Sequence, residues 1–206
     1  MGDFNISEDG AIIRLSEKLR EKIVFISHDT RDWQYANLLC ALIEKASQGH
    51  LKTFCTSRSG DIGYGEEWYR DIMDNISKSV AIICLLTKNS VKKPWILFEA
   101  GLAKGRFPNR AIRALNIDAN IKNSPFSNFQ LCHLCICKCP IVCRCVKKEE
   151  KEVAELVKQI VQDNTTLIIT NKDTLNVIEK AVKAFFKNLQ KLKKNQITTK
   201  QGTKQT

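Results

Sequence analysis

The sequence predicts an α/β protein built around a central parallel sheet that is flanked by helices. Two nearly unbroken apolar runs, at residues 22–27 and 80–86, are typical of parallel strands that are buried on both faces. Stretches with helical spacing of apolar residues separate these runs from each other and from weaker strand candidates. Such alternation of strands and helices indicates a parallel sheet covered by its crossover helices.

The predicted elements follow the chain in strict alternation. The helix after the first strand begins near Asp29 or Asp32, either of which can cap it, and Gly49 ends it. The second helix begins after a glycine-rich loop at residues 56–65. The strand candidates lie at residues 22–27, 51–55, 80–86 and 112–117. The inward-facing residues are Trp33, Ala36, Leu39, Leu42, Ile43 and Ala46 in the first helix and Trp68, Ile72 and Ile76 in the second.

The chain is predicted to divide into four segments. Residues 1–21 form a short lead-in helix, and residues 22–146 form the α/β domain. Residues 147–194 hold two amphipathic helices, and each has an apolar stripe that is expected to pack back onto the domain. The polar residues 195–206 are predicted to be a disordered tail.

The chain is strongly basic, and the excess charge is concentrated in its C-terminal half. Lys and Arg number 33 against 22 Asp and Glu, which corresponds to a formal net charge of +11. Lysines spread along a helix usually form a solvated face, so binding to nucleic acid or to an anionic membrane is disfavoured. The charged start of the chain is unlike a signal peptide, and the longest central apolar run is too short for a membrane span. A cytoplasmic protein is therefore expected.

A cysteine-rich run occupies residues 132–145, with the spacing C-x2-C-x-C-x-C-x3-C-x-C. Cys135, Cys137 and Cys139 alternate and would share one face of a strand. The run lacks the two separated C-x2-C pairs of typical zinc sites, so no metal site is predicted. The favoured interpretation is a fifth strand with buried, reduced thiols, and a soft-metal or redox site is the alternative. Residues 118–131 indicate an irregular crossover, and the fold of residues 118–146 stays open.

The segment Pro94–Arg106 combines helix-forming and unusual features. Pro94 suits the first turn of a helix, where a missing N–H costs nothing. Trp95 and Glu99 are four residues apart and therefore lie on one face, one turn from each other. Apolar neighbours raise the cost of an ionised carboxylate, which makes Glu99 a candidate functional group. The alternative is a half-exposed Glu on an ordinary amphipathic helix.

Four stretches of the chain together resemble a bacterial, single-domain TIR (Toll/interleukin-1 receptor) domain. They are KIVFISHDTRD at 22–32, FCTSRSGDIGYGEEW at 54–68, SVAIICLLTKNS at 79–90 and PWILFEAG at 94–101. The resemblance implies a flavodoxin-like fold with strand order 2-1-3-4-5. In catalytic members of that family the Glu of W-x-x-x-E cleaves NAD+, and the matching residue here is Glu99.

The implied strand order locates a candidate site. In such a sheet a ligand crevice lies beyond the carboxyl ends of strands one and three. Ser27, His28 and Asp29 follow the first strand, and the mobile loop that contains Arg58 and the helix start at Trp95 lie on the same side. These five residues are predicted to bind the substrate, with Glu99 as the catalytic residue. Core packing for Trp95, loop orientation for His28 and solvation for Arg58 are the alternatives.

The resemblance implies a chemistry that needs only one essential carboxylate. The nicotinamide of NAD+ is already cationic and leaves neutral, so no general acid is required, unlike in ordinary glycosidases. Glu99 would stabilise the oxocarbenium-like ribose, and the product would be ADP-ribose or a cyclic ADP-ribose. NAD+ is then a substrate, and no separate cofactor is expected.

The predicted function is that of an NAD+ nucleosidase resembling Thoeris-type TIR proteins, in anti-phage signalling. Expected partners are other TIR domains, through self-association, and a downstream effector that senses a cyclic product. The alternatives are a non-catalytic TIR assembly module and a basic, Cys-rich nucleic-acid or metal-binding protein. Motifs typical of P-loop NTPases, zinc proteases and α/β-hydrolases are not found in the sequence.

Overall fold

The computed structural model describes residues 21–55, 66–106, 112–128, 130–134 and 144–202 of the chain. The predicted lead-in helix, Arg58 and the alternating Cys135, Cys137 and Cys139 lie outside the described residues.

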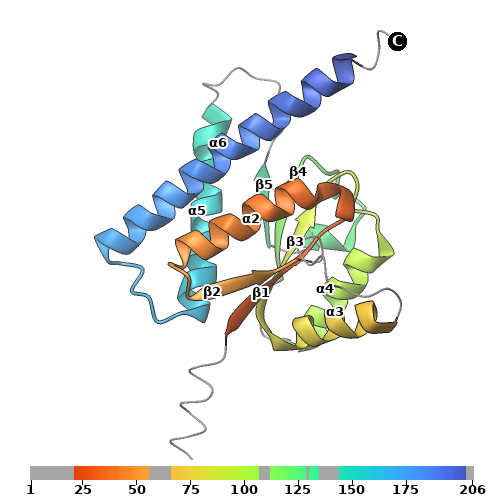
Figure 1. The fold of residues 1–206 in the computed structure, drawn as a ribbon, viewed down its shortest axis with the longest axis horizontal. Coiled ribbons are helices and arrows are strands. Elements are labelled where there is room, and N and C mark those ends of the chain that lie inside the picture. Colours follow the sequence, from red (N-terminus) through yellow and green to blue (C-terminus); the bar gives the residue numbers. More distant parts are fainter. Residues whose placement is uncertain (1–20, 56–65, 107–111, 129, 135–143, 203–206) are drawn as a thin grey trace, which may run out of the picture.

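A five-stranded parallel sheet forms the centre of the protein (Figure 1). Its strand order is β2-β1-β3-β4-β5, and every neighbouring pair is parallel. The predicted flavodoxin-like order 2-1-3-4-5 is therefore confirmed. The strands are β1 (Lys22–Ser27), β2 (Leu51–Phe54), β3 (Ser79–Leu86), β4 (Arg113–Ile117) and β5 (Gln130–Leu134).

Helices cover both faces of the sheet, as Figure 1 shows. One face carries α2 (Trp33–Ala46), α5 (Arg144–Asn164) and α6 (Lys172–Gly202). The other face carries α3 (Glu66–Lys78) and α4 (Pro94–Arg106). Two short 3-10 helices, η1 (Thr30–Asp32) and η2 (Pro125–Asn128), lie in the connections.

The buried strands explain the apolar runs in the sequence. In β1, Val24 and Ile26 contribute to the core beneath α2, α5 and α6, whereas Phe25 contributes to the core beneath α3 and α4. In β3, Ile83 and Cys84 divide between the two cores in the same way. Successive side chains of a strand point to opposite faces, so a strand covered on both faces has to be apolar throughout.

The C-terminal helices pack against the rest of the fold. Apolar side chains of α5 and α6 belong to the same core as those of α2 and of the sheet. In α6 they are Ile178, Ala181, Val182, Phe185, Phe186 and Leu189, all fully or nearly buried. Helix α6 spans Lys172–Gly202.

Three local expectations differ from the structure. β5 begins at Gln130, and Cys132 is the one cysteine of the cysteine-rich run within it. Helix α5 begins at Arg144, three residues before the predicted start of the C-terminal helices. Trp33 is 49% exposed, because it is the first residue of α2, directly after η1, and not part of the packed stripe. None of the helices in the described part of the chain is both long and apolar enough to cross a membrane.

A buried polar network joins the end of β1 to the loop between β3 and α4. The Asp32 side chain is 2% exposed and accepts hydrogen bonds from Thr87 Oγ1 at 2.5 Å and from Asn89 Nδ2 at 2.7 Å. Within the loop, Ser90 Oγ donates to the Leu85 carbonyl oxygen at 2.8 Å. A buried carboxylate is tolerated only when such donors replace its lost water. The network therefore holds the loop that precedes α4.

Replacing Asp32 with alanine should lower the free energy of unfolding by about 1–3 kcal/mol, because the buried Thr87 hydroxyl and the half-buried Asn89 amide would lose their acceptor. Urea unfolding followed by circular dichroism measures this change. The matched control is Asp71→Ala, which removes an exposed carboxylate from α3 and should change stability by about 0.5 kcal/mol or less. Equal effects of the two substitutions would show that the network does not stabilise the fold.

Candidate active site

Glu99 lies in the second turn of α4, where the helix passes the carboxyl end of β1. Its side chain is 2% exposed. Ser27, the last residue of β1, donates a hydrogen bond from its hydroxyl to Glu99 Oε2. The carboxylate is therefore buried and directed at the carboxyl edge of the sheet, which is where open parallel sheets bind ligands.

The burial of Glu99 changes its acid–base behaviour. Loss of water raises the pKa of the carboxyl to about 7, although hydrogen bonds from the Ser27 and Trp95 side chains act in the opposite direction. Burial penalises the charged form, whereas donated hydrogen bonds favour it. Near neutral pH the group is therefore close to half ionised, which is the range in which a carboxylate can change charge during a reaction cycle.

A thiol that the sequence analysis did not single out completes the buried cluster. Cys84 on β3 pairs with Ser27 in the parallel register of the sheet, and it is fully buried. Burial, together with the charge of Glu99, raises the pKa of the Cys84 thiol to about 12. The thiol is therefore neutral at physiological pH. Only the strand register brings it beside Glu99, since the two residues carry no common motif.

His28 and Asp29 follow Ser27 and make contacts within their own loop. His28 is 7% exposed, and its Nδ1 lies 3.2 Å from the Ile26 carbonyl oxygen. Asp29 caps η1 and accepts hydrogen bonds from Arg31 Nε at 2.7 Å and from the Arg31 backbone N–H at 3.0 Å. The Arg31 guanidinium holds the pKa of Asp29 below its usual range. Arg31 also donates to the Asn89 carbonyl oxygen at 3.2 Å, and so ties this loop to the one before α4.

Trp95 is half-buried and connects Glu99 to a group of aromatic rings. Its ring centroid is 5.2 Å from that of Phe98 and 6.2 Å from that of Tyr69 on α3. Among the predicted site residues, the structure brings together Ser27, Trp95 and Glu99. His28 and Asp29 follow Ser27 in the sequence and make the contacts described above.

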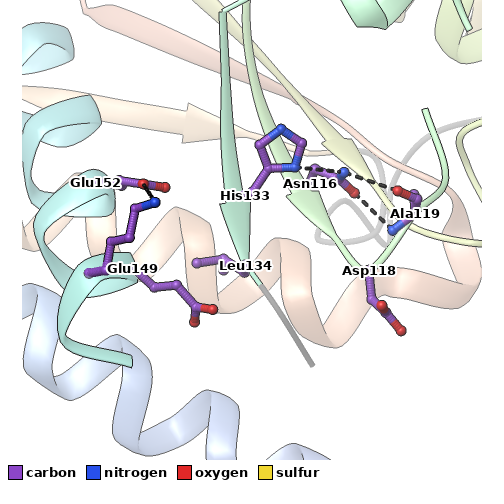
Figure 2. Close-up of a pocket in the computed structure, with 8 residues that line it drawn as sticks. Asn116, Asp118, Ala119, His133, Leu134, Glu149 and Glu152 are labelled. Atoms are coloured by element: carbon purple, nitrogen blue, oxygen red, sulfur yellow. Dashed lines mark hydrogen bonds and ion pairs between the residues drawn. The ribbon is translucent and has the colours of Figure 1, made fainter. Parts of the chain in front are cut away.

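A hollow lies at the carboxyl ends of β4 and β5, away from Glu99, and Figure 2 shows it. It has a volume of about 450 Å³. His133 Nδ1 lies 3.1 Å from Asn116 Nδ2, and the two residues are register partners on adjacent strands. Glu149 and Glu152 of α5 line the opposite side. The sequence analysis missed these residues because they come from distant segments without a shared motif.

Potential metal ligands are scattered in the described part of the chain. No group of three or more His, Cys, Asp or Glu residues there is arranged to hold a metal ion. The side chains of Cys40, Cys55, Cys84 and Cys132 are buried.

The fold and the site define a class of protein: a flavodoxin-like α/β domain with a buried carboxylate at the carboxyl edge of its sheet. The family model for the TIR domain matches residues 24–135, which is more than half of the chain. The chain belongs to the TIR domain family, as the sequence resemblance predicts. Comparison with curated proteins finds no match.

Replacing Ser27 with alanine should raise the pKa of Glu99 above about 7, because the hydroxyl donates to the carboxylate and stabilises its charged form. Ser27→Thr keeps the hydroxyl and should leave the pKa near its original value. The measurement is a pH titration of the Glu99 carboxyl resonance by 13C NMR.

The control for this titration is Ser79→Ala. Ser79 is equally buried, but it lies at the opposite end of the sheet, where its hydroxyl donates to the Asn75 carbonyl oxygen at 2.6 Å. This substitution should leave the Glu99 pKa unchanged. An unchanged pKa in Ser27→Ala as well would mean that the hydroxyl does not hold the carboxylate in solution.

Proposed function

We propose that the protein is an NAD+ nucleosidase that cleaves the bond between nicotinamide and ribose. The single observation that carries this proposal is the burial of Glu99 at the carboxyl edge of a TIR domain sheet, where Ser27 and Trp95 hydrogen-bond its carboxylate. A buried carboxylate lowers the stability of a fold, so its presence there favours a role in chemistry.

The proposed reaction separates charge in a way that suits one carboxylate. The electron pair of the C1′–N bond leaves with nicotinamide, which becomes neutral, and positive charge develops on the ribose. Ionised Glu99 stabilises that charge at short range, in surroundings from which water is excluded. Water then attacks C1′ and loses a proton to give ADP-ribose, or an internal nucleophile attacks to give a cyclic ADP-ribose.

A second candidate is a non-catalytic TIR module that assembles with other TIR domains. The observation in its favour is the 2% exposure of Glu99, since its carboxylate is already satisfied by Ser27 and Trp95. In the catalytic proposal, substrate reaches the carboxylate when the neighbouring side chains open. Both proposals include other TIR domains as partners, through self-association. Only the catalytic proposal includes an effector that senses a cyclic product.

Replacing Glu99 with glutamine should lower the rate of nicotinamide release by about a hundredfold or more, because the amide keeps the shape but loses the charge that stabilises the transition state. The measurement is incubation of concentrated pure protein with NAD+ and identification of the products by mass spectrometry. Release from wild type with no loss in Glu99→Gln would place the chemistry elsewhere. No release from wild type would favour the assembly module.

Glu44→Gln is the matched control for this experiment. Glu44 is a partly buried carboxylate on α2 that accepts a hydrogen bond from the Thr53 hydroxyl, much as Glu99 accepts one from Ser27. It lies on the other face of the sheet, and its substitution should leave the reaction rate unchanged. A loss of similar size in both variants would indicate damage to the fold and not loss of a catalytic group.

The rate of NAD+ cleavage should rise with pH through about 7, the pKa of Glu99. The reason is that only the ionised carboxylate stabilises the cationic ribose, and this form dominates above the pKa. The measurement is kcat/KM for NAD+ over roughly two pH units on each side of that pKa, which spans the change from the protonated to the ionised form. A rate that is flat or falls through this range would contradict the assigned role.

A further inference from the structure

Helix α6 carries a straight row of lysines on its outer face. Lys180, Lys183, Lys187 and Lys191 are all exposed, and they follow one another at intervals of three or four residues. Residues at such intervals share one face of a helix, so the row extends along about 16 Å of the helix axis. These four residues are called the lysine row below.

The lysine row lies opposite the buried side of α6. Ile178, Phe185 and Leu189 belong to the core that α6 shares with α2 and α5, and Figure 1 shows the three helices together. These apolar side chains hold the helix against the domain, so the row is free to contact another molecule. Glu99 belongs to α4, which covers the other face of the sheet. A ligand on the row therefore leaves the candidate active site uncovered.

The charge of α6 differs from that of the neighbouring helix. Helix α5 contains five basic and five acidic residues, and Lys148 forms an ion pair with Glu152. By contrast, the sequence after Glu179 contains eight lysines and no acidic residue. Like charges one turn apart lower the stability of a helix, so a solvated face usually mixes the two signs, as α5 does. The uniform charge of α6 therefore points to an anionic partner.

The lysine row is not neutralised by its surroundings. In the part of the chain that the structure describes, no ion pair involves any of its four members. Lys183 also borders a hollow between α5 and α6 whose rim contains four lysines and three glutamates. Positive charge therefore exceeds negative charge beside the row as well as within it.

A partner for the lysine row has to carry closely spaced negative charges along a line. Duplex DNA does so, with one phosphate charge for each roughly 1.7 Å of its axis. Lysine ammonium groups attract phosphates as point charges, and phosphate contacts carry no sequence information. A membrane fits less well, because helices that bind a bilayer surface insert an apolar face, and the apolar face of α6 is in the core. Proteins that bind single strands use aromatic stacking, and the row contains no aromatic residue.

We propose that the lysine row is a docking surface for the phosphate backbone of duplex DNA, without preference for base sequence. Lysines spread along a helix usually form a solvated face, which is why composition alone disfavours nucleic acid. Here four of them are aligned and exposed on a helix whose other side is anchored in the core. The surface is independent of the proposed function, since it does not involve Glu99.

Binding through four lysines predicts a defined dependence on salt. Each neutralised phosphate releases counterions, so the logarithm of the association constant falls with the logarithm of the salt concentration, with a slope of about −0.9 per contact. Four contacts give a slope of about −3.6, which corresponds to roughly hundredfold weaker binding at 200 mM than at 50 mM salt.

The experiment measures the Kd of the full chain for a short fluorescein-labelled DNA duplex by fluorescence anisotropy. The test variant replaces all four lysines of the row with glutamine, and its affinity at about 50 mM salt should fall about tenfold or more. The control variant has the same net charge, because it replaces four exposed lysines on other elements, and its Kd should stay within about twofold of wild type. The control substitutions are Lys45→Gln, Lys52→Gln, Lys92→Gln and Lys122→Gln.

A single substitution keeps the test independent of the folding of the fourfold variant. Lys187→Gln removes one exposed ammonium group from the middle of the row and should make the salt slope less negative by about 0.9. Circular dichroism of each variant should match wild type, because every substituted side chain is exposed.

Three results would overturn the inference. Equal losses in the fourfold variant and its charge-matched control would show that DNA responds to net charge and not to the row. Binding of phosphatidylserine vesicles or of polyglutamate, without binding of the duplex, would assign the row to another anionic partner. No binding of the duplex by wild type at about 50 mM salt would reject the surface altogether.

Glu99→Gln separates this inference from the proposed function. This variant should lose NAD+ cleavage and yet bind the duplex with the Kd of wild type, because the row and Glu99 lie on helices that cover opposite faces of the sheet. Conversely, the variant without the lysine row should cleave NAD+ at the wild-type rate when no DNA is present. Failure of either proposal therefore leaves the test of the other intact.

Discussion

The hydrogen bond between the Ser27 hydroxyl and the Glu99 carboxylate joins strand β1 to the helix that carries the candidate catalytic group. It allows a carboxylate with 2% exposure to exist beside the apolar side chains of α4 and the sheet. Without a donor at this position the charged form would bear the full cost of lost hydration. The contact also determines which way Glu99 points, because the end of β1 lies at the ligand-binding edge of the sheet.

The surroundings of this contact hold its two partners in place. Asp32, through Thr87 and Asn89, joins the loop after β1 to the loop that precedes α4. Arg31 bonds both Asp29 and the Asn89 carbonyl oxygen, and so adds a second link between the same two loops. Polar networks of this kind stabilise one arrangement of a site when every member is satisfied. The position of Glu99 relative to Ser27 is therefore set by contacts that lie outside the site itself.

Burial and reactivity oppose each other at Glu99. The same desolvation that raises its pKa to about 7 would strengthen its attraction for a cationic ribose once the carboxylate is ionised. The half-buried Trp95 lies between this carboxylate and the solvent-exposed rings of Tyr69 and Phe98.

The order of strands and helices was predictable from the sequence, because β1 and β3 are apolar throughout and the helices between them have regular apolar spacing. Glu99 and Trp95 were predictable as a pair, because helical spacing alone places them on one face. The register of the strands and the packing of the helices decided which residues from distant segments lie side by side. Cys84 lies beside Ser27 only through strand pairing, and Tyr69 meets Phe98 only because α3 and α4 pack together. The exposure of Trp33 likewise depends on how α2 packs, which local patterns in a sequence do not contain.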